Sequence, residues 1–235
     1  MDKPDTAEKP GLTAWQRFVG AILGPRAVFE DVIKHPRFWG GALISLGVTL
    51  GLNVLTIPRL QAFVRHQIAD THLPPDQAAM LLQGAIIGAV FVPLIGLFAI
   101  WLVYAFLLKA VNLFSGERVP FETFYAIAVF AYVPTLVGEA VRTVLRWVVP
   151  VEKFAFVNTS LAFFLPAPAD PQHPGLLYLV LSRIDPFTLW TLALLTLGGS
   201  LAMKTKGRTV AAGVFSGWVL YVMGYVVLVL LSGPS

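Results

Sequence analysis

Cysteine is absent from this sequence of 235 residues, and its absence excludes several kinds of chemistry together. Without thiols the chain forms no disulfide, no zinc–thiolate site and no iron–sulfur cluster, and it offers no thiol nucleophile. Other catalytic motifs are absent too, because the sequence contains no phosphate-binding loop ending in Lys-Ser or Lys-Thr, no His-Glu-x-x-His pair and no nucleophile elbow. We therefore expect neither enzymatic activity nor a cofactor.

Histidine and aspartate are too sparse for an intramembrane enzyme. All four histidines lie outside the long uncharged stretches described below, although an intramembrane serine protease needs a histidine at that depth. Asp185 is a single aspartate at the start of an apolar stretch, whereas an intramembrane aspartyl protease would need two buried aspartates. His66 and Asp70 could share a helix face with His72 or Asp76 nearby, but prolines follow at once and nothing fixes further metal ligands. We expect this segment to be solvated and to hold no metal.

Charged residues make up only 13% of the chain, about half the share typical of a soluble domain. Hydrophobic residues reach 57%, and the mean hydropathy is +0.75. The formal net charge is +4, but no basic run alternates with aromatic residues as in a nucleic-acid groove. We assign the excess positive charge to segments that flank the apolar stretches and face anionic lipid, and we expect no nucleic-acid partner.

Five stretches of about 16 to 32 residues contain no charged side chain, and neither do residues 154–169, where Pro166 and Pro168 argue against a spanning helix. A bilayer core about 30 Å thick is crossed by a helix of about 20 apolar residues, and the backbone groups of such a segment must satisfy one another. The sequence therefore predicts an all-α polytopic membrane protein with a bundle of about five transmembrane helices in residues 38–231. The predicted spans are 38–57, 84–108, 121–140, 184–203 and 209–231.

Basic residues indicate the orientation of the bundle. The segments 1–37, 109–120 and 204–208 fall on one side and hold eleven lysines and arginines, against six on the other side. Because cytoplasmic loops carry the excess, we expect insertion in the cytoplasmic (inner) membrane with the N-terminus in the cytoplasm and the C-terminus outside. Residues 150–174 then form an external loop rich in proline.

The N-terminal tail, residues 1–37, contains two short amphipathic segments. Thr13 and Gln16 have the spacing of a capping box, and apolar residues then recur at helical spacing. Gly24-Pro25 ends this helix and starts another, which ends at His35-Pro36. We expect both to lie in the headgroup plane with the apolar face toward lipid, the alternative being a helix that binds a partner. A further short amphipathic helix is predicted over residues 60–68.

Glu139, Arg142 and Arg146 form the one ionisable cluster near a predicted span. Their spacing places them on one helix face, so the carboxylate can pair with Arg142. A lone charge at the bilayer centre costs about 2.5–3.5 kcal/mol on insertion scales, which makes such groups functional candidates. The interpretation that we favour from sequence alone is that the helix leaves the membrane here. Asn53 and Asp185 complete the set of candidate intramembrane polar residues.

Prolines and paired glycines mark the predicted spans. Pro93 and Pro134 lie inside two of them and should bend their helices. Three Gly-x-x-x-Gly pairs on three spans allow close approach of helices, either within the bundle or between protomers. These pairs are Gly47 and Gly51, Gly84 and Gly88, and Gly213 and Gly217.

Four passages together resemble the Yip family of membrane proteins in its bacterial form. They are GPRAVFEDVIKHPRFW from Gly24, FETFYAIAVFAYVPTLV from Phe121, SRIDPFTLWTLALLTLGG from Ser182, and the basic link with the glycine-rich last span. The resemblance covers residues 20–230 and implies a five-helix bundle with a cytoplasmic N-terminus. Eukaryotic members bind Rab-type GTPases and other Yip proteins. This chain lacks the DLYGP motif and has a short N-terminal tail, and both departures count against GTPase binding.

These observations favour a non-enzymatic membrane protein that acts through helix packing, as an adaptor, a scaffold or an organiser of the membrane. Its expected partners are membrane lipids and either another protein or further copies of itself. The alternative is a small transporter or channel with a polar pathway near Glu139 and Asn53, although few polar residues line the spans. A water-filled cavity that reaches both residues would favour transport.

The charge bias and the odd number of spans predict a specific topology. A reporter that is active only in the cytoplasm should work when it is fused after Arg208 and should fail when it is fused at Ser235. Activity at both positions would exclude a bundle with five spans.

Overall fold

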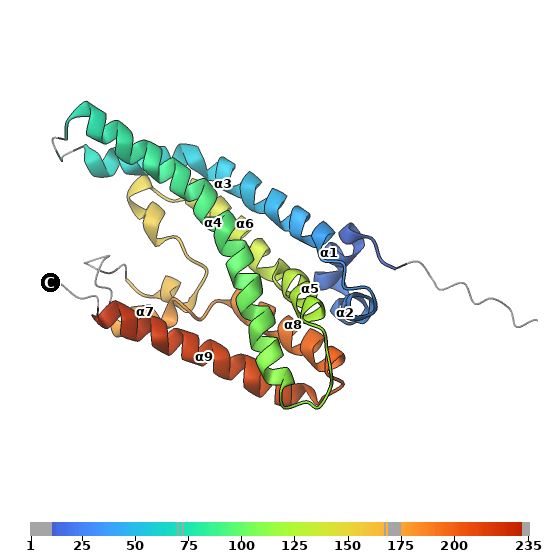
Figure 1. Ribbon diagram of the computed structural model, residues 1–235. Coiled ribbons are helices and arrows are strands. Elements are labelled where there is room, and N and C mark those ends of the chain that lie inside the picture. Colours follow the sequence, from blue (N-terminus) through green and yellow to red (C-terminus); the bar gives the residue numbers. More distant parts are fainter. Residues whose placement is uncertain (1–10, 70, 72, 167, 169–174, 232–235) are drawn as a thin grey trace, which may run out of the picture.

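The computed structural model describes residues 11–69, 71, 73–166, 168 and 175–231, and these residues form helices and loops without any strand. Figure 1 shows the helices as a bundle with α1 and α2 at one end. In chain order the elements are α1 (Ala14–Leu23), α2 (Pro25–Lys34), α3 (Trp39–Ile68), α4 (Pro75–Asn112), α5 (Phe121–Ala131), α6 (Val133–Val148), the 3-10 helices η1 (Val151–Phe156) and η2 (Leu161–Phe164), α7 (Leu176–Leu181), α8 (Pro186–Ala202) and α9 (Gly207–Leu231).

The predicted class, a helical membrane bundle, is confirmed. Four helical segments of the described chain are long and apolar enough to cross a membrane, namely α3, α4, α5 with α6, and α9. The fifth predicted span is α8, which has 17 residues and a length of about 26 Å. That length lies at the lower limit for a spanning helix.

Several helices are longer than the sequence indicates. Residues 60–68 are helical as predicted, but they continue α3 through Pro58 and do not form a separate helix. The next helix, α4, begins at Pro75, nine residues before the predicted start of the span at residue 84. Hydropathy marks only the part of a helix that suits lipid, whereas Arg59 and Asp76 lie on helical turns beyond that part.

The centre of the bundle is formed by α5, α6 and α8. In the apolar window of α5 and α6, 61% of the residues are buried, against 11% in α4 and 11% in α9. The large side chains at the centre include Phe124, Ile127 and Phe130 of α5 and Leu195 of α8, all fully buried. We therefore place α4 and α9 at the periphery, with most of their surface toward lipid.

At Tyr132 the central helix breaks into α5 and α6. Pro134 has no amide hydrogen, so the carbonyl of Phe130 loses its usual helical donor and one bond of the helical ladder is missing. By contrast, α4 continues through Pro93 as one helix. The two prolines predicted as kinks thus act differently.

The N-terminal helices begin as the sequence predicts. The Gln16 amide donates to the Thr13 hydroxyl at 3.2 Å, and the Thr13 amide donates to Gln16 Oε1 at 2.9 Å, which completes the capping box. Pro25 occupies the first turn of α2. Trp15 remains 63% exposed, as a residue at the lipid surface would be.

The packing of α2 differs from the prediction of an interfacial helix. Its apolar residues Val28, Phe29 and Val32 are buried, and the helix packs against α8 and α5. A Cβ atom added to Gly198 of α8 would lie 3.1 Å from the Phe29 ring, so the two helices are in close contact there. The apolar face of α2 therefore belongs to the core of the bundle.

A buried ion pair joins α1 to α2. Arg17 is 3% exposed, and its Nε donates to Asp31 Oδ2 at 2.6 Å. Its Nη1 donates to the carbonyl of Arg37 at 3.0 Å, just before α3. One guanidinium thus joins α1 to α2 and to the residues that precede α3.

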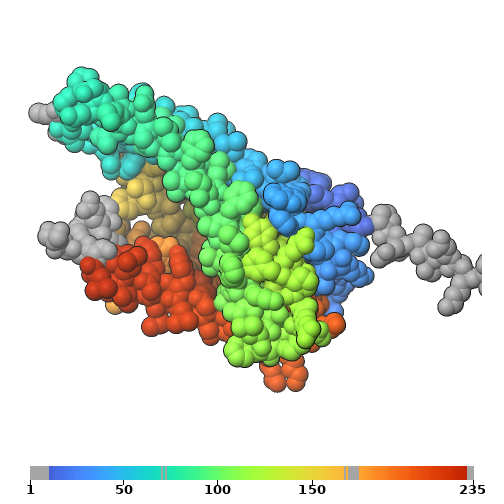
Figure 2. Space-filling view, in the orientation of Figure 1, coloured from blue at the N-terminus to red at the C-terminus, as the bar shows by residue number. Residues whose placement is uncertain are grey.

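Only one of the three glycine pairs is used inside the bundle. A Cβ atom added to Gly213 would lie 2.4 Å from Val111, and one added to Gly217 would lie 2.5 Å from Leu107, so α9 packs closely on α4 there. Beyond this contact the two helices diverge, and Figure 2 shows the surface hollowed between them. A Cβ atom added at the other four predicted positions would meet no described atom within 4 Å. These positions are Gly47, Gly51, Gly84 and Gly88.

Candidate functional site

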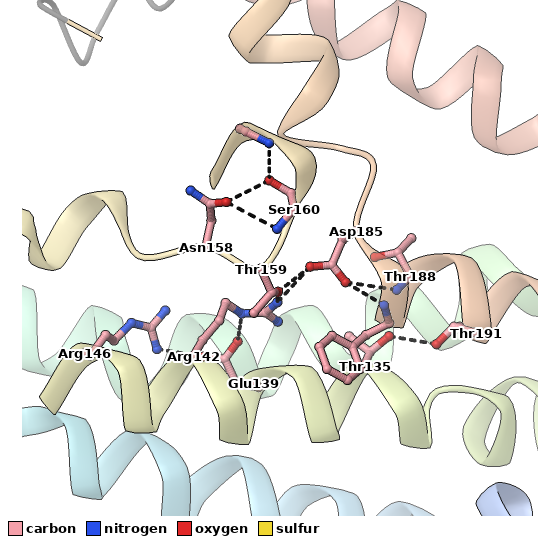
Figure 3. A network of polar contacts seen from close by, with 12 residues as sticks. Thr135, Glu139, Arg142, Arg146, Asn158, Thr159, Ser160, Asp185, Thr188 and Thr191 are labelled. Carbon is pink, nitrogen blue, oxygen red and sulfur yellow. Dashed lines mark hydrogen bonds and ion pairs between the residues drawn. The ribbon is translucent and has the colours of Figure 1, made fainter. Parts of the chain in front are cut away.

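The most polar part of the bundle is a group of charges near the C-terminal end of α6. Glu139, Arg142 and Arg146 share one face of this helix, and they are shown with their partners in Figure 3. Arg142 Nε donates to Glu139 Oε2 at 2.9 Å, and Arg146 Nη1 donates to Glu139 Oε1 at 2.8 Å. One carboxylate therefore binds two arginines, which confirms the predicted pair and adds a second one.

Asp185 extends this group to α8. Arg142 Nη1 lies 3.5 Å from Asp185 Oδ2 and donates to the Thr159 hydroxyl at 2.9 Å, while that hydroxyl donates to Asp185. The other carboxylate oxygen of Asp185 accepts from the amides of Phe187 at 2.8 Å and Thr188 at 3.2 Å. Asp185 thus caps the N-terminus of α8 and pairs with an arginine of α6.

These four charged side chains, which we call the charge network, are largely covered by protein. Their side chains are 28% exposed in Glu139, 20% in Arg142, 22% in Arg146 and 11% in Asp185. Two carboxylates balance two guanidinium groups, so the network carries no net charge. Removal of one member would leave an unbalanced charge in a weakly hydrated place.

The turn before η2 positions Thr159. The side chain of Asn158 accepts from the amide of Ser160 at 3.2 Å and from its hydroxyl at 2.9 Å. The amide of Leu161 donates to the carbonyl of Ile184 at 2.9 Å, which fastens the turn beside α8. This turn lies within the loop predicted over residues 150–174, but the role of Thr159 was not predicted, although Asn-Thr-Ser is a typical turn-forming run.

Two further contacts hold α6 against its neighbours. The hydroxyls of Thr135 and Thr191 lie 2.8 Å apart between α6 and α8. Arg59 of α3 donates to the carbonyl of Arg146 at 2.9 Å and to that of Val149, so a cation covers the C-terminus of α6. Contacts with α3, with α8 and with the turn before η2 therefore hold the charge network in place.

Two cavities adjoin the charge network. One, of about 270 Å³, is lined by Asn53, Glu139 and Arg146 together with Pro93 and nearby apolar residues. The other, of about 500 Å³, lies on the opposite side and is lined by Arg142 and Asp185. The sequence-predicted residues therefore face two separate spaces. The side-chain nitrogen of Asn53 is buried and has no hydrogen-bond partner among the described residues.

Metal ligands are not grouped in the described part of the chain, where no three His, Asp or Glu residues come together. Of the segment considered for a metal, Asp70 and His72 lie outside the described residues. His66 lies 4.0 Å from Glu152 at the surface, where both side chains are more than half exposed.

Comparisons with known proteins agree with the resemblance noted in the sequence. A family model described as the Yip1 domain matches residues 19–231. This chain is similar to the membrane protein YknW of Bacillus subtilis (strain 168), with 26% identity over 219 residues, which cover 91% of this chain and 86% of that protein. No solved structure matches significantly.

Glu139→Gln should lower the stability of the bundle by about 2 kcal/mol, because Arg142 would keep Asp185 whereas Arg146 would lose the carboxylate with which it pairs. Adding Arg146→Gln restores the charge balance, so the double variant should melt at a higher temperature than Glu139→Gln alone. Thermal unfolding in mild detergent would measure both changes.

A matched control is the exposed pair of Arg26 and Glu30, whose side chains are 74% and 52% exposed. Glu30→Gln should leave the melting temperature unchanged within the error of measurement. If Glu139→Gln melts like Glu30→Gln, the network does not stabilise the bundle.

Proposed function

We propose that this chain, which belongs to the Yip1 domain family, is a non-enzymatic adaptor or scaffold in the cytoplasmic membrane. Its long apolar helices support a role within the membrane. It acts by packing its transmembrane helices against those of another protein or of a second copy. The charge network has a structural part in this proposal, because it holds the central helices in place.

The observation that carries this proposal is the outward position of two glycine pairs. No described atom lies within 4 Å of a Cβ atom added to Gly47 or Gly51 of α3, or to Gly84 or Gly88 of α4. Helices in lipid gain little from apolar contact alone, since the acyl chains are equally apolar, and they associate where small residues allow close packing. The same spacing in α9 lies against α4 inside the bundle, which supports this role for the motif.

The distribution of basic residues supports the proposed orientation. Lys204, after α8, lies 3.5 Å from Glu117, before α5, so two of the three predicted cytoplasmic segments meet at one end of the bundle. At the opposite end, Arg142 and Arg146 are engaged in the charge network and Arg59 covers the end of α6. The orientation therefore rests on the count of eleven lysines and arginines on the first side against six on the second.

Replacement of Gly47 and Gly51 by leucine tests the proposed surface. The double variant should lose its protein partner, because the added side chains keep a neighbouring helix away, while its melting temperature should stay unchanged. Crosslinking in membranes, followed by mass spectrometry and by detection of two differently tagged copies, would identify the partner.

Gly213→Leu is the matched control, because this glycine packs against Val111 within the bundle. It should lower the melting temperature by several degrees without a specific loss of crosslinking. Unchanged crosslinking of the Gly47→Leu, Gly51→Leu variant would contradict an adaptor surface on α3.

A specific observation also favours the alternative of a transporter. Asn53 and Glu139, the two residues named for a polar pathway, line the same cavity of about 270 Å³. Arg146 adds a cation to its wall. A cavity with these groups could take part in transport if water connects it to one side of the membrane.

The cysteine-free sequence provides a direct test of this alternative. Under the adaptor proposal, Asn53→Cys should resist a membrane-impermeant thiol reagent in opened membranes, because no water path reaches the cavity. Lys206→Cys, at an exposed link, is the reactive control, and Leu43→Cys, 66% exposed on the apolar face of α3, is the unreactive one. Modification of Asn53→Cys at the rate of Lys206→Cys would favour transport.

A further inference from the structure

The larger cavity is a wedge between two peripheral helices. Its walls include Ile100, Val103 and Leu107 of α4 and Trp218 and Tyr221 of α9, and its volume is about 500 Å³. At its narrow end, Leu107 lies against Gly217, where α4 and α9 touch. The hollow between these helices in Figure 2 corresponds to the divergence beyond that contact. Because both helices cross the bilayer and are mostly unburied, the wedge is within reach of lipid.

The lining divides into an apolar part and a polar part. The apolar part consists of Ile100, Val103, Leu107, Leu192 and Trp218. The polar part gathers hydroxyl, amide, guanidinium and carboxylate groups from the turn before η2 and from the residues that precede α8. These polar residues are Asn158, Thr159, Ser160, Ser182, Arg183 and Asp185. Both kinds of surface within one cavity fit an amphiphile better than a small polar solute.

Arg183 gives the polar part a positive charge. Its guanidinium lies 3.6 Å from the centre of the Tyr225 ring, and its Nη1 lies 3.4 Å from the Tyr221 hydroxyl. Its Nε is buried and has no hydrogen-bond partner among the described residues. No carboxylate of the described residues forms an ion pair with it, whereas Asp185 is engaged by Arg142. A stacked guanidinium with unused donors is suited to bind an anionic oxygen.

We propose that this wedge binds one anionic glycerophospholipid. The phosphate lies at Arg183 beside the hydroxyls of Ser182 and Tyr221, and an acyl chain runs along Ile100, Val103 and Trp218 toward the contact of Leu107 with Gly217. The rest of the lipid stays in the bilayer between α4 and α9. A zwitterionic headgroup carries its own cation, which Arg183 repels, so the site prefers a lipid with net negative charge.

Trp218 reports directly on this site. The full-length protein is reconstituted in vesicles of zwitterionic lipid that contain a small fraction of either phosphatidylglycerol or phosphatidylcholine with brominated acyl chains, which quench tryptophan on contact. Subtraction of the Trp218→Phe signal isolates Trp218. We expect brominated phosphatidylglycerol to quench it at about one-fifth of the concentration needed with brominated phosphatidylcholine.

Variants separate a bound lipid from the general lipid annulus. Arg183→Gln should abolish the preference, whereas Arg208→Gln, at the far end of α9, should leave it intact. Trp147, 50% exposed at the end of α6, faces the general annulus and should show no preference. The same melting temperature for Arg183→Gln and the parent in lipid-free detergent confirms that the variant is folded. If it melts lower, Arg183→Lys, which keeps the charge, should retain most of the preference.

Two results would overturn the proposal. One is equal quenching of Trp218 by the two brominated lipids, and the other is a preference that persists in Arg183→Gln. Soluble glycerol phosphate distinguishes a lipid from its headgroup alone. At millimolar concentration it should not relieve the quenching, because it has no acyl chain to occupy the apolar part, and relief would assign the site to a soluble phosphate.

Discussion

Local neutralisation of arginine is the constraint on which this bundle depends. A guanidinium that leaves water must find carboxylates or carbonyls close by, because an unpaired charge in an apolar surrounding is strongly destabilising. Arg17 meets Asp31 and a backbone carbonyl at one end, and Arg142 and Arg146 meet Glu139 and Asp185 at the other. The first group joins the consecutive helices α1 and α2, and the second joins α6 to α8, which is more distant in the sequence. The charges therefore determine which helices are held together at the two ends, while apolar packing fills the centre.

The bundle consequently has a closely packed centre and a less buried periphery. The central helices α5, α6 and α8 are joined by buried aromatic residues, by a hydroxyl pair and by the charge network. In contrast, α4 and α9 contact each other closely at two glycines and diverge beyond them. Surfaces that could receive another molecule, the outward glycines and the wedge beside Arg183, lie on these outer helices or on α3. The buried core thus carries outer helices whose surfaces are open on the side away from the core.

Much of this arrangement could be predicted from local sequence signals, and the remainder depends on tertiary contacts. The capping box of Thr13 and Gln16 and the spacing of Glu139 and Arg142 required only nearby residues, and both were found. The limits of α3 and α4 were missed because hydropathy marks the segment in lipid and not the helix that continues into water. Thr159 was missed because it joins the network only when the turn before η2 folds back onto α8. Likewise, no local pattern indicates that Gly213 packs on α4 while Gly47 faces outward.

The contact of α9 with α4 also has a mechanical consequence. Gly213 and Gly217 are one helical turn apart, about 6 Å, whereas α9 continues from Gly217 to Leu231 for about 21 Å. Over that length α9 is held from its other side, because α7 packs against it and the guanidinium of Arg183 stacks on Tyr225. The glycines thus fix where α9 meets α4, and the contacts on its other side keep the rest of α9 away from α4, so the wedge stays open.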